Sequence, residues 1–416
     1  MTRTLAAPAT VVDDSTRPLD HHDAADSPGR AVGRFAALEG YRGVAALLIV
    51  VFHLYQFMRF GSPARYPYAH TPWNLVLQQL DGFVDLFFVL SAFLLTLPYA
   101  RTALAGGRPL AGRQFLFRRS ARIVPLYFVA VLLVWSARTT SFPGDWRDLL
   151  SHLTFLQVYD QRRIFYTIGP AWSLAVEVQF YVLLALVGAA LCRICRHLGS
   201  PNARRTVLYS SVTATAALGL GSRLLAAYGL HRPAQDWPFW FSLPAKLDVF
   251  AVGMLLAVIV AARGDRKNLS RPMLWIVRLT GLGLLCWGFL SRASDPLPEL
   301  YFHDWCAMGF GLLLAASVLG RRTRSGGLLA TRPLAGLGLV SYSLYMWHEP
   351  LMLWLAGSGL LPTPGTPQAF PLGLLVLVPV ALLVAYTSYW LIEYPASRLR
   401  RNRDADGHRR DYYDGT

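Results

Sequence analysis

Two polar side chains lie in one apolar stretch, and their types suit proton transfer and anion binding. Arg42 and His53 both belong to the run FAALEGYRGVAALLIVVFHLYQF, which covers residues 35–57. On a helix this spacing places them within about 20° of the same face and roughly 16 Å apart along the axis. Histidine exchanges a proton near neutral pH, whereas arginine keeps its charge and binds phosphate. The alternative is that Arg42 is a membrane anchor and His53 a packing residue.

A second basic pair precedes the next apolar segments. Arg119 and Arg122 are spaced i, i+3, so they share one face of a helix. Two guanidinium groups on one face beside a membrane entrance suit a phosphate clamp. Anionic lipid headgroups and the orientation of the chain in the membrane offer an alternative reason for the pair.

A polar stripe opens the apolar run at 171–192. Ser173, Glu177 and Tyr181 repeat at i, i+4, i+8 and therefore stack along one face of a helix, with Trp172 beside them. A carboxylate inside a membrane helix costs free energy unless it has a partner or a function. The stripe therefore predicts a functional or paired glutamate.

Two other runs carry single polar groups into the membrane. Asp85 and Ser91 lie within residues 82–99, and Asp85 either orients a histidine, pairs with a cation or lies in water at the outer interface. His348 competes with His53 for the proton-transfer role, but it precedes a kink expected at Pro350 and has no arginine in line.

The elements that must position these residues are membrane helices. Of the 416 residues, 54% are hydrophobic and only 15% are charged, which is too apolar for a soluble domain of this length. The sequence predicts an all-α integral membrane protein, a bundle of about ten transmembrane helices. The expected spans are 35–58, 82–99, 123–138, 171–192, 207–230, 239–262, 273–291, 301–320, 334–357 and 370–393.

The basic residues predict the orientation of this bundle. With both termini in the cytoplasm, 29 of the 40 Lys and Arg residues fall on the cytoplasmic side and 8 on the outer side. The net charge of +16 then reflects topology and not nucleic-acid binding. We expect a disordered cytoplasmic tail at 1–34, the membrane domain at 35–399 and a polar cytoplasmic tail at 400–416.

Six motifs, in order and spacing, resemble the membrane-bound acyltransferase family 3, a group of integral membrane O-acyltransferases. The similarity runs from about Leu38 to Leu399. Glu39 stands where the family usually has Asp, and Ala92 stands where it usually has Gly, which bears on helix packing. The motifs are LEGYRGVAALLIVVFH, VDLFFVLSAF, RRSARIVPLY, PAWSLAVEVQFY, SYSLYMWHEPL and IEYPASRL.

The resemblance implies an acyl-CoA-dependent O-acyltransferase with His53 as the catalytic histidine. Acetyl-CoA is the first candidate donor, and His53 removes a proton from an acceptor hydroxyl as that hydroxyl attacks the thioester. Glu177 or Asp85 would orient the imidazole. A covalent acyl-histidine is an open alternative. The resemblance assigns the donor head to Arg42, Arg119 and Arg122, and we expect the cavity to include Ser91, Trp172, Ser173, Tyr181 and His348.

The acceptor is expected to be a hydroxyl of a sugar, a glycolipid, a polysaccharide or a secreted small molecule such as a macrolide. We expect no metal, since the single CxxC at Cys192 and Cys195 has no second pair. Only Lys246 and Lys267 are lysines, a bias that fits a GC-rich bacterium and hence a multi-pass protein of its cytoplasmic membrane.

Two other classes compete with the enzyme. A transporter or flippase of a lipid-linked or amphiphilic substrate would also use buried histidine and carboxylate groups, as proton relays. No pair of inverted, Gly/Pro-broken repeats supports it. A membrane sensor without catalysis gives no reason for the stripe around Glu177.

Overall fold

The structure is a computed structural model that describes residues 28–109, 111–141, 143–264, 269–292, 300–320 and 327–398, with side chains from residue 37 onward. Across these ranges all regular secondary structure is helical, which confirms the predicted all-α class. Most of the expected tails, at 1–27 and 399–416, lies outside the described residues.

Ten long helices form the body of the described chain. They are α1 (Pro28–Phe57), α3 (Phe83–Ala105), α4 (Gly112–Arg138), α6 (Ala171–His197), α7 (Pro201–Leu224), α9 (Leu243–Arg263), α10 (Arg271–Arg292), α11 (Phe302–Leu319), α13 (Ser341–Gly357) and α14 (Ala369–Ser388). Shorter elements connect them: α2 (Pro72–Leu77), η1 (Leu80–Gly82), α5 (Trp146–Leu153), η2 (Gln157–Tyr159), η3 (Leu225–Gly229), α8 (Trp237–Trp240), η4 (Leu328–Ala330), α12 (Arg332–Leu339) and η5 (Tyr389–Glu393).

Each of the ten predicted spans contains one of these long helices. In the part of the chain that the structure describes, eight helical segments are long and apolar enough to cross a membrane. The other two long helices are α13, which has only 17 residues, and α7, whose 24 residues include three arginines. The boundaries differ by a few residues at most ends, and α4 begins at Gly112, 11 residues before the predicted start at 123. Helix α1 begins at Pro28, and the predicted span 334–357 is divided at Val340 into α12 and α13. The packing of α12 on α1 decides this break, at a point where Gly336 and Gly338 lower the helix propensity.

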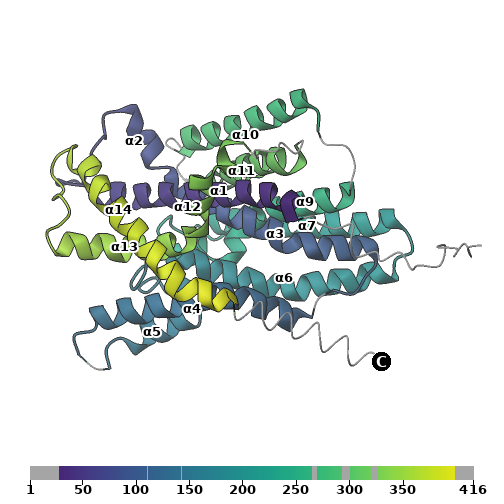
Figure 1. Ribbon diagram of the computed structural model, residues 1–416, viewed down its shortest axis with the longest axis horizontal. Coiled ribbons are helices and arrows are strands. Elements are labelled where there is room, and N and C mark those ends of the chain that lie inside the picture. The colour runs from purple at the N-terminus through teal and green to yellow at the C-terminus, as the bar shows by residue number, and fades with distance from the viewer. Residues whose placement is uncertain are drawn as a thin grey trace, which may run out of the picture.

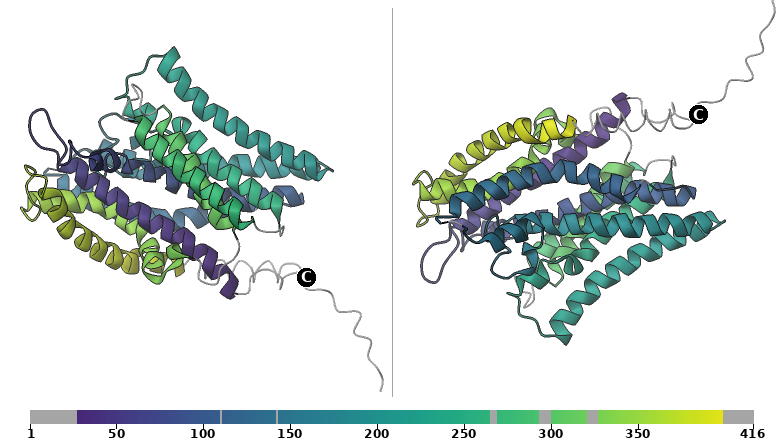
Figure 2. Two further views of the ribbon diagram at one scale, coloured as in Figure 1. Left: turned by 90° about the horizontal axis from the view of Figure 1, so that it is seen from above. Right: turned by 90° about the horizontal axis from the view of Figure 1, so that it is seen from below.

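The long helices run side by side along the longest axis of the molecule (Figures 1 and 2). The start of α1 and the end of α14 lie at the same end of the bundle, as the right-hand view of Figure 2 shows. The two described ends of the chain therefore lie on one side, which is the arrangement that an even number of crossings produces.

The apolar core has two parts that meet at the site described below. The larger part is formed mainly by α3, α4, α6, α9 and α11, and the smaller by α1, α13 and α14. Phe87 on α3 packs against both parts. A polar cavity at such a junction can draw side chains from both halves of the bundle.

Close packing of α3 against α9 explains one unusual residue of the second motif. A Cβ atom placed on Gly253 would lie 2.1 Å from the Val89 carbonyl oxygen and 2.7 Å from Ala92 Cβ. Only glycine fits on the α9 side of this crossing. Ala92 itself is fully buried, so its methyl group fills the space opposite Gly253.

Candidate active site

Five helices enclose a cavity of about 90 Å³ between the two parts of the core. It receives Arg42 from α1, and α13 contributes one wall through Ser341, Tyr342 and Tyr345. Seven of the side chains predicted from the sequence meet on this one surface, although they come from four helices. They are Arg42, Ser91, Arg119, Arg122, Ser173, Glu177 and Tyr181.

Glu177 is the carboxylate at the centre of this cavity. Its Oε1 accepts one hydrogen bond from the Ser91 hydroxyl and another, 2.6 Å long, from the Tyr181 hydroxyl one turn along α6. Its Oε2 has no hydrogen-bond partner among the residues the structure describes. The carboxylate is therefore held by one oxygen, and the other is available to a ligand.

The arginines give one side of the cavity a positive potential. Arg42 Nη1 donates to both carboxylate oxygens of Glu39, at 3.0 and 3.3 Å, so part of its charge is balanced within α1. Arg122 is exposed and Arg119 partly exposed, one turn apart on α4. Three guanidinium groups around one cavity can bind a multiply charged phosphate group, and the exposed Arg122 leaves such a ligand a route in.

His53 lies beyond this cavity, against α13. Its Nδ1 is 3.1 Å from Nε2 of His348 and 3.0 Å from the carbonyl oxygen of Ile49. His348 is fully buried, and its Nδ1 is 2.7 Å from the carbonyl oxygen of Tyr345. Arg42 and His53 thus both lie on the side of α1 that faces α13.

These contacts assign the protons of the two neutral rings. A carbonyl oxygen only accepts, so Nδ1 of His348 carries the hydrogen and its Nε2 is an acceptor. Nδ1 of His53 then donates to that Nε2 and to the Ile49 carbonyl. Nε2 of His53 is left without a hydrogen, and within the described chain it has no hydrogen-bond partner. His53 therefore presents an unprotonated nitrogen, as a general base requires.

Tyr345 connects the cavity with the histidine pair. It lines the cavity, its ring centroid is 5.8 Å from that of His348, and on its other side it packs edge-on against Phe87, also at 5.8 Å. Sequence reasoning missed Tyr345, Tyr342 and Phe87. The spacing i, i+3, i+6 of Tyr342, Tyr345 and His348 in the SYSLYMWHEPL motif is the signal that could have found the two tyrosines.

Neither carboxylate expected to orient His53 does so. Glu177 bonds Ser91 and Tyr181, and Asp85 accepts a hydrogen bond from Nδ1 of His303 on α11 at 2.8 Å. The partner of His53 is His348 instead. This expectation failed because α13, a short helix far along the chain, packs directly against α1.

Trp172 is also placed differently from the rest of its stripe. Its ring packs edge-on against Phe241 at 4.3 Å and against Phe88 at 6.0 Å, and it does not line the cavity. The ammonium group of Lys246 lies 5.4 Å from the Phe241 ring and 6.0 Å from the Trp172 ring. Trp172 thus borders a second group of buried charges.

This second group of charged side chains lies between the helices. Arg223 on α7 bonds both Asp248 on α9 and Asp304 on α11, the latter at 2.6 Å. Arg223 is 1% exposed and Lys246 equally buried. Together with Asp85 and His303, these residues form what we call the closed cluster, none of which lines the cavity.

The fold and the site define an integral membrane protein with a polar, arginine-lined cavity inside a helical bundle. A family model described as "Acyltransferase domain" matches residues 35–390. The chain belongs to this family, the membrane-bound acyltransferase family 3, as its motifs predicted.

Curated relatives agree with this membership. The chain is 25% identical over 344 residues to the O-acetyltransferase OatA of Staphylococcus aureus, which covers 76% of this chain and 50% of that protein. It is 22% identical over 389 residues to the peptidoglycan O-acetyltransferase OatA of Listeria monocytogenes, covering 88% of this chain and 56% of that protein. The chain thus spans about half the length of these relatives. No solved structure matches the chain.

Proposed function

We propose that this protein is an O-acyltransferase that moves a short acyl group, acetyl first, from acyl-CoA to a hydroxyl group. The observation that carries the proposal is the joining of Arg42, Arg119 and Arg122 around one cavity, with Tyr345 linking that cavity to the pair His53–His348. The phosphates of an acyl-CoA need a cationic binding site, which the arginines supply. The acceptor hydroxyl needs a group that takes its proton, which the imidazole of His53 supplies.

In this proposal the arginines hold the phosphates of the donor. The thin arm of coenzyme A then passes between Phe87 and Tyr345, whose rings lie in edge-on contact, and so brings the thioester to the level of His53. The arm must cover the roughly 16 Å along α1 that separate Arg42 from His53. Donor binding would move the two rings and open the passage, so that His53 becomes accessible only when the donor is present.

The reaction follows from the free nitrogen of His53. Nε2 accepts the proton of the acceptor hydroxyl while the hydroxyl oxygen attacks the thioester carbonyl carbon. The carbon–sulfur bond then breaks, and the departing thiolate takes the proton back from His53, giving free coenzyme A and an ester. His348 accepts the hydrogen bond from Nδ1 of His53 throughout and so stabilises the charged ring. General-base assistance of this kind contributes about 10²- to 10⁴-fold.

The acceptor is a hydroxyl of a cell-surface glycan, a glycolipid or a secreted small molecule. Sugar hydroxyls are favoured because one relative, of which the match covers 56%, is named for peptidoglycan. We place the protein in a bacterial cytoplasmic membrane, with the arginine end of the cavity on the cytoplasmic side, where acyl-CoA is made and where the basic residues predict the inner face.

The test is a gene deletion complemented with variants. Lipid, glycan and metabolite mass profiles of the deletion strain should lack one acylated species, and the wild-type gene should restore it. His53→Ala should not restore it, although the purified variant should still bind coenzyme A and elute as a folded protein. Full restoration by His53→Ala would remove His53 from the mechanism. An unchanged profile in the deletion strain, together with transport of a lipid or proton in vesicles without acyl-CoA, would replace the enzyme with a transporter.

A further inference from the structure

The connection between α4 and α6, residues 139–170, returns into the bundle instead of remaining on its surface. The Tyr127 hydroxyl donates to the carbonyl oxygen of His152 at 3.1 Å and accepts from Gln157 Nε2 at 3.2 Å. Tyr127 lies 11 residues before the end of α4 at Arg138, which is about 16 Å along the helix. Helix α5 therefore runs back along the outer half of α4, as Figure 1 shows.

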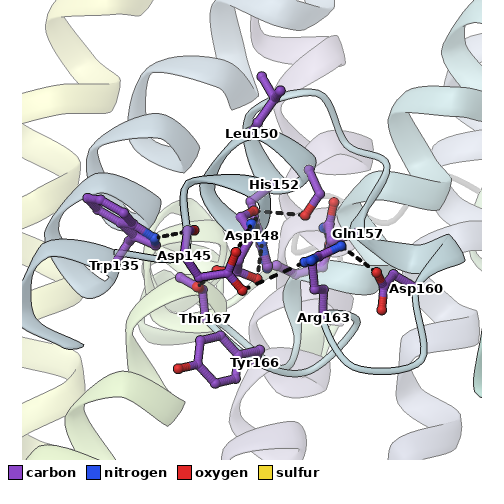
Figure 3. Close-up of polar contacts among 12 residues, drawn as sticks. Trp135, Asp145, Asp148, Leu150, His152, Gln157, Asp160, Arg163, Tyr166 and Thr167 are labelled. Atoms are coloured by element: carbon purple, nitrogen blue, oxygen red, sulfur yellow. Dashed lines mark hydrogen bonds and ion pairs between the residues drawn. The ribbon is translucent and has the colours of Figure 1, made fainter. Parts of the chain in front are cut away.

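Helix α5 has two polar residues on its inner face and two apolar residues on its outer face. Asp148 and His152 have no exposed surface, whereas Trp146 and Leu150 are half exposed. The Asp148 carboxylate lies between two partners (Figure 3): Nδ1 of His152 at 3.2 Å, and the hydroxyl of Thr167, which donates to it. This polarity suits a segment whose outer face meets lipid and whose inner face is bonded within the protein.

The buried Thr167 begins a short strap that crosses to α13. We use the word strap for residues 167–170. The Gly169 amide donates to Glu349 Oε2 at 2.6 Å, and the Tyr345 hydroxyl donates to the Pro170 carbonyl at 3.1 Å. The two residues of α13 that hold the strap lie on either side of His348.

The strap and α13 are in close contact at Gly169, where a larger residue would meet the Glu349 side chain. A Cβ atom placed on Gly169 would lie 2.6 Å from Glu349 Oε1 and 2.8 Å from Oε2. Glycine lets the carboxylate lie directly against the backbone amide, and a side chain at this position would displace the end of Glu349. The position of Glu349, and with it the turn of α13 that carries His348, is therefore set by the strap.

We propose that Glu349 is a positioning residue for the histidine pair, acting through its bond to Gly169. The strap fixes the turn of α13 at Tyr345–Glu349, this turn fixes His348, and His348 orients His53. The inference rests on the proposed function for its kinetic part, but not for its structural part. It makes the α4–α6 connection a part of the catalytic site that contributes no reacting group.

The kinetic test compares two substitutions of Glu349. Glu349→Ala should lower kcat about 100-fold, since a displacement of about 1 Å in reacting groups has that effect, with the KM for acyl-CoA unchanged. Glu349→Gln keeps an oxygen that accepts from Gly169 and should stay within a few-fold of wild type. A loss with Gln as large as with Ala would mean that Glu349 transfers a proton, and the positioning role would be wrong.

A rescue experiment uses the tight fit at Gly169. Gly169→Ala should impair kcat, because the new methyl group collides with the Glu349 carboxylate. Adding Glu349→Asp, which shortens that side chain, should recover at least part of the loss. Gln161→Ala is the matched control: Gln161 belongs to the same connection but bonds the carbonyl of Gln235 at 3.0 Å, away from α13, and its loss should leave kcat unchanged. Additive losses in the Gly169–Glu349 double variant would contradict the proposal.

A spectroscopic readout does not depend on activity. The ring nitrogen signals of ¹⁵N-histidine report which nitrogen carries hydrogen, and those of His53 and His348 can be assigned with His53→Gln and His348→Gln. Glu349→Ala should shift both pairs of signals away from the wild-type pattern, and Glu349→Gln should not. Unaltered signals in Glu349→Ala would overturn the inference even if the wild-type protein proved to be a transporter, whereas a shift without any acyl transfer would refute only the proposed function.

Discussion

The cavity and the closed cluster contain the same kinds of side chain inside the same bundle, yet they differ in what their charges face. In the closed cluster, Arg223 is 1% exposed and bonds carboxylates from two other helices. In the cavity, Arg122 is exposed and Glu177 keeps one oxygen without a partner in the described chain. A buried charge thus marks a binding site when it borders open space, and a structural lock when other helices supply its partners.

The largest expected effect is on the stability of the closed cluster. Arg223→Met removes the positive charge that Asp248 and Asp304 share, and the buried Asp248 carboxylate loses its ion-pair partner, which should cost about 3–5 kcal/mol in the free energy of unfolding. Thermal unfolding of the purified protein in detergent measures this loss. The control is Arg232→Met: Arg232 is 42% exposed and paired with Asp236, so its loss should cost at most about 1 kcal/mol. Equal shifts in the two variants would erase the distinction between the cluster and a surface pair.

An intermediate effect is expected on donor binding at the cavity. Arg119→Ala combined with Arg122→Ala should weaken coenzyme A binding, because a hydrogen bond to a charged group contributes about 1.5–3 kcal/mol, or roughly 10- to 100-fold in Kd for each arginine. The melting temperature should change little. Calorimetric titration with coenzyme A measures the affinity, and Arg113→Ala, an exposed arginine on the same helix outside the cavity, is the control. If the double variant bound coenzyme A normally, these arginines would serve orientation in the membrane only.

The smallest expected effect is at the hydrogen bonds that hold Glu177. Ser91→Ala removes one of its two hydroxyl donors and Tyr181→Phe removes the other. Each should lower kcat/KM by about 2- to 10-fold, the value of a single hydrogen bond of roughly 0.5–1.5 kcal/mol. Steady-state kinetics with labelled acetyl-CoA would measure it. A loss of stability comparable to that of Arg223→Met would place Glu177 with the structural charges instead.

The sequence predicted the helices well and the partners of its charges poorly. Apolar runs of spanning length are a local signal, so each of the ten ranges contained a helix. The stripe of Ser173, Glu177 and Tyr181 was also predictable, because its members share one helix. The cavity then brought this stripe together with Arg42 and the α4 arginines.

Contacts between helices distant in the chain were not predictable from spacing. His53 and His348 are 295 residues apart, and Asp85 and His303 are 218 residues apart. No local sequence pattern therefore indicates either of these two pairs. Two other features were not predicted because tertiary contacts decide them. The helix break at Val340 depends on the packing of α12 on α1, and the re-entrant course of α5 depends on the burial of Asp148 and His152.

The edge-on contact of Phe87 with Tyr345 has a consequence for the cell as a whole. A continuous polar channel from an arginine-lined mouth to a pair of imidazoles would short-circuit the membrane potential by letting protons and anions cross. In the proposed function, the rings of Phe87 and Tyr345 would lie across that route and keep the bilayer electrically insulating while no donor is bound. A protein that takes an acyl donor into the membrane can preserve the membrane potential only if such a barrier opens for the donor and stays closed to protons and other ions.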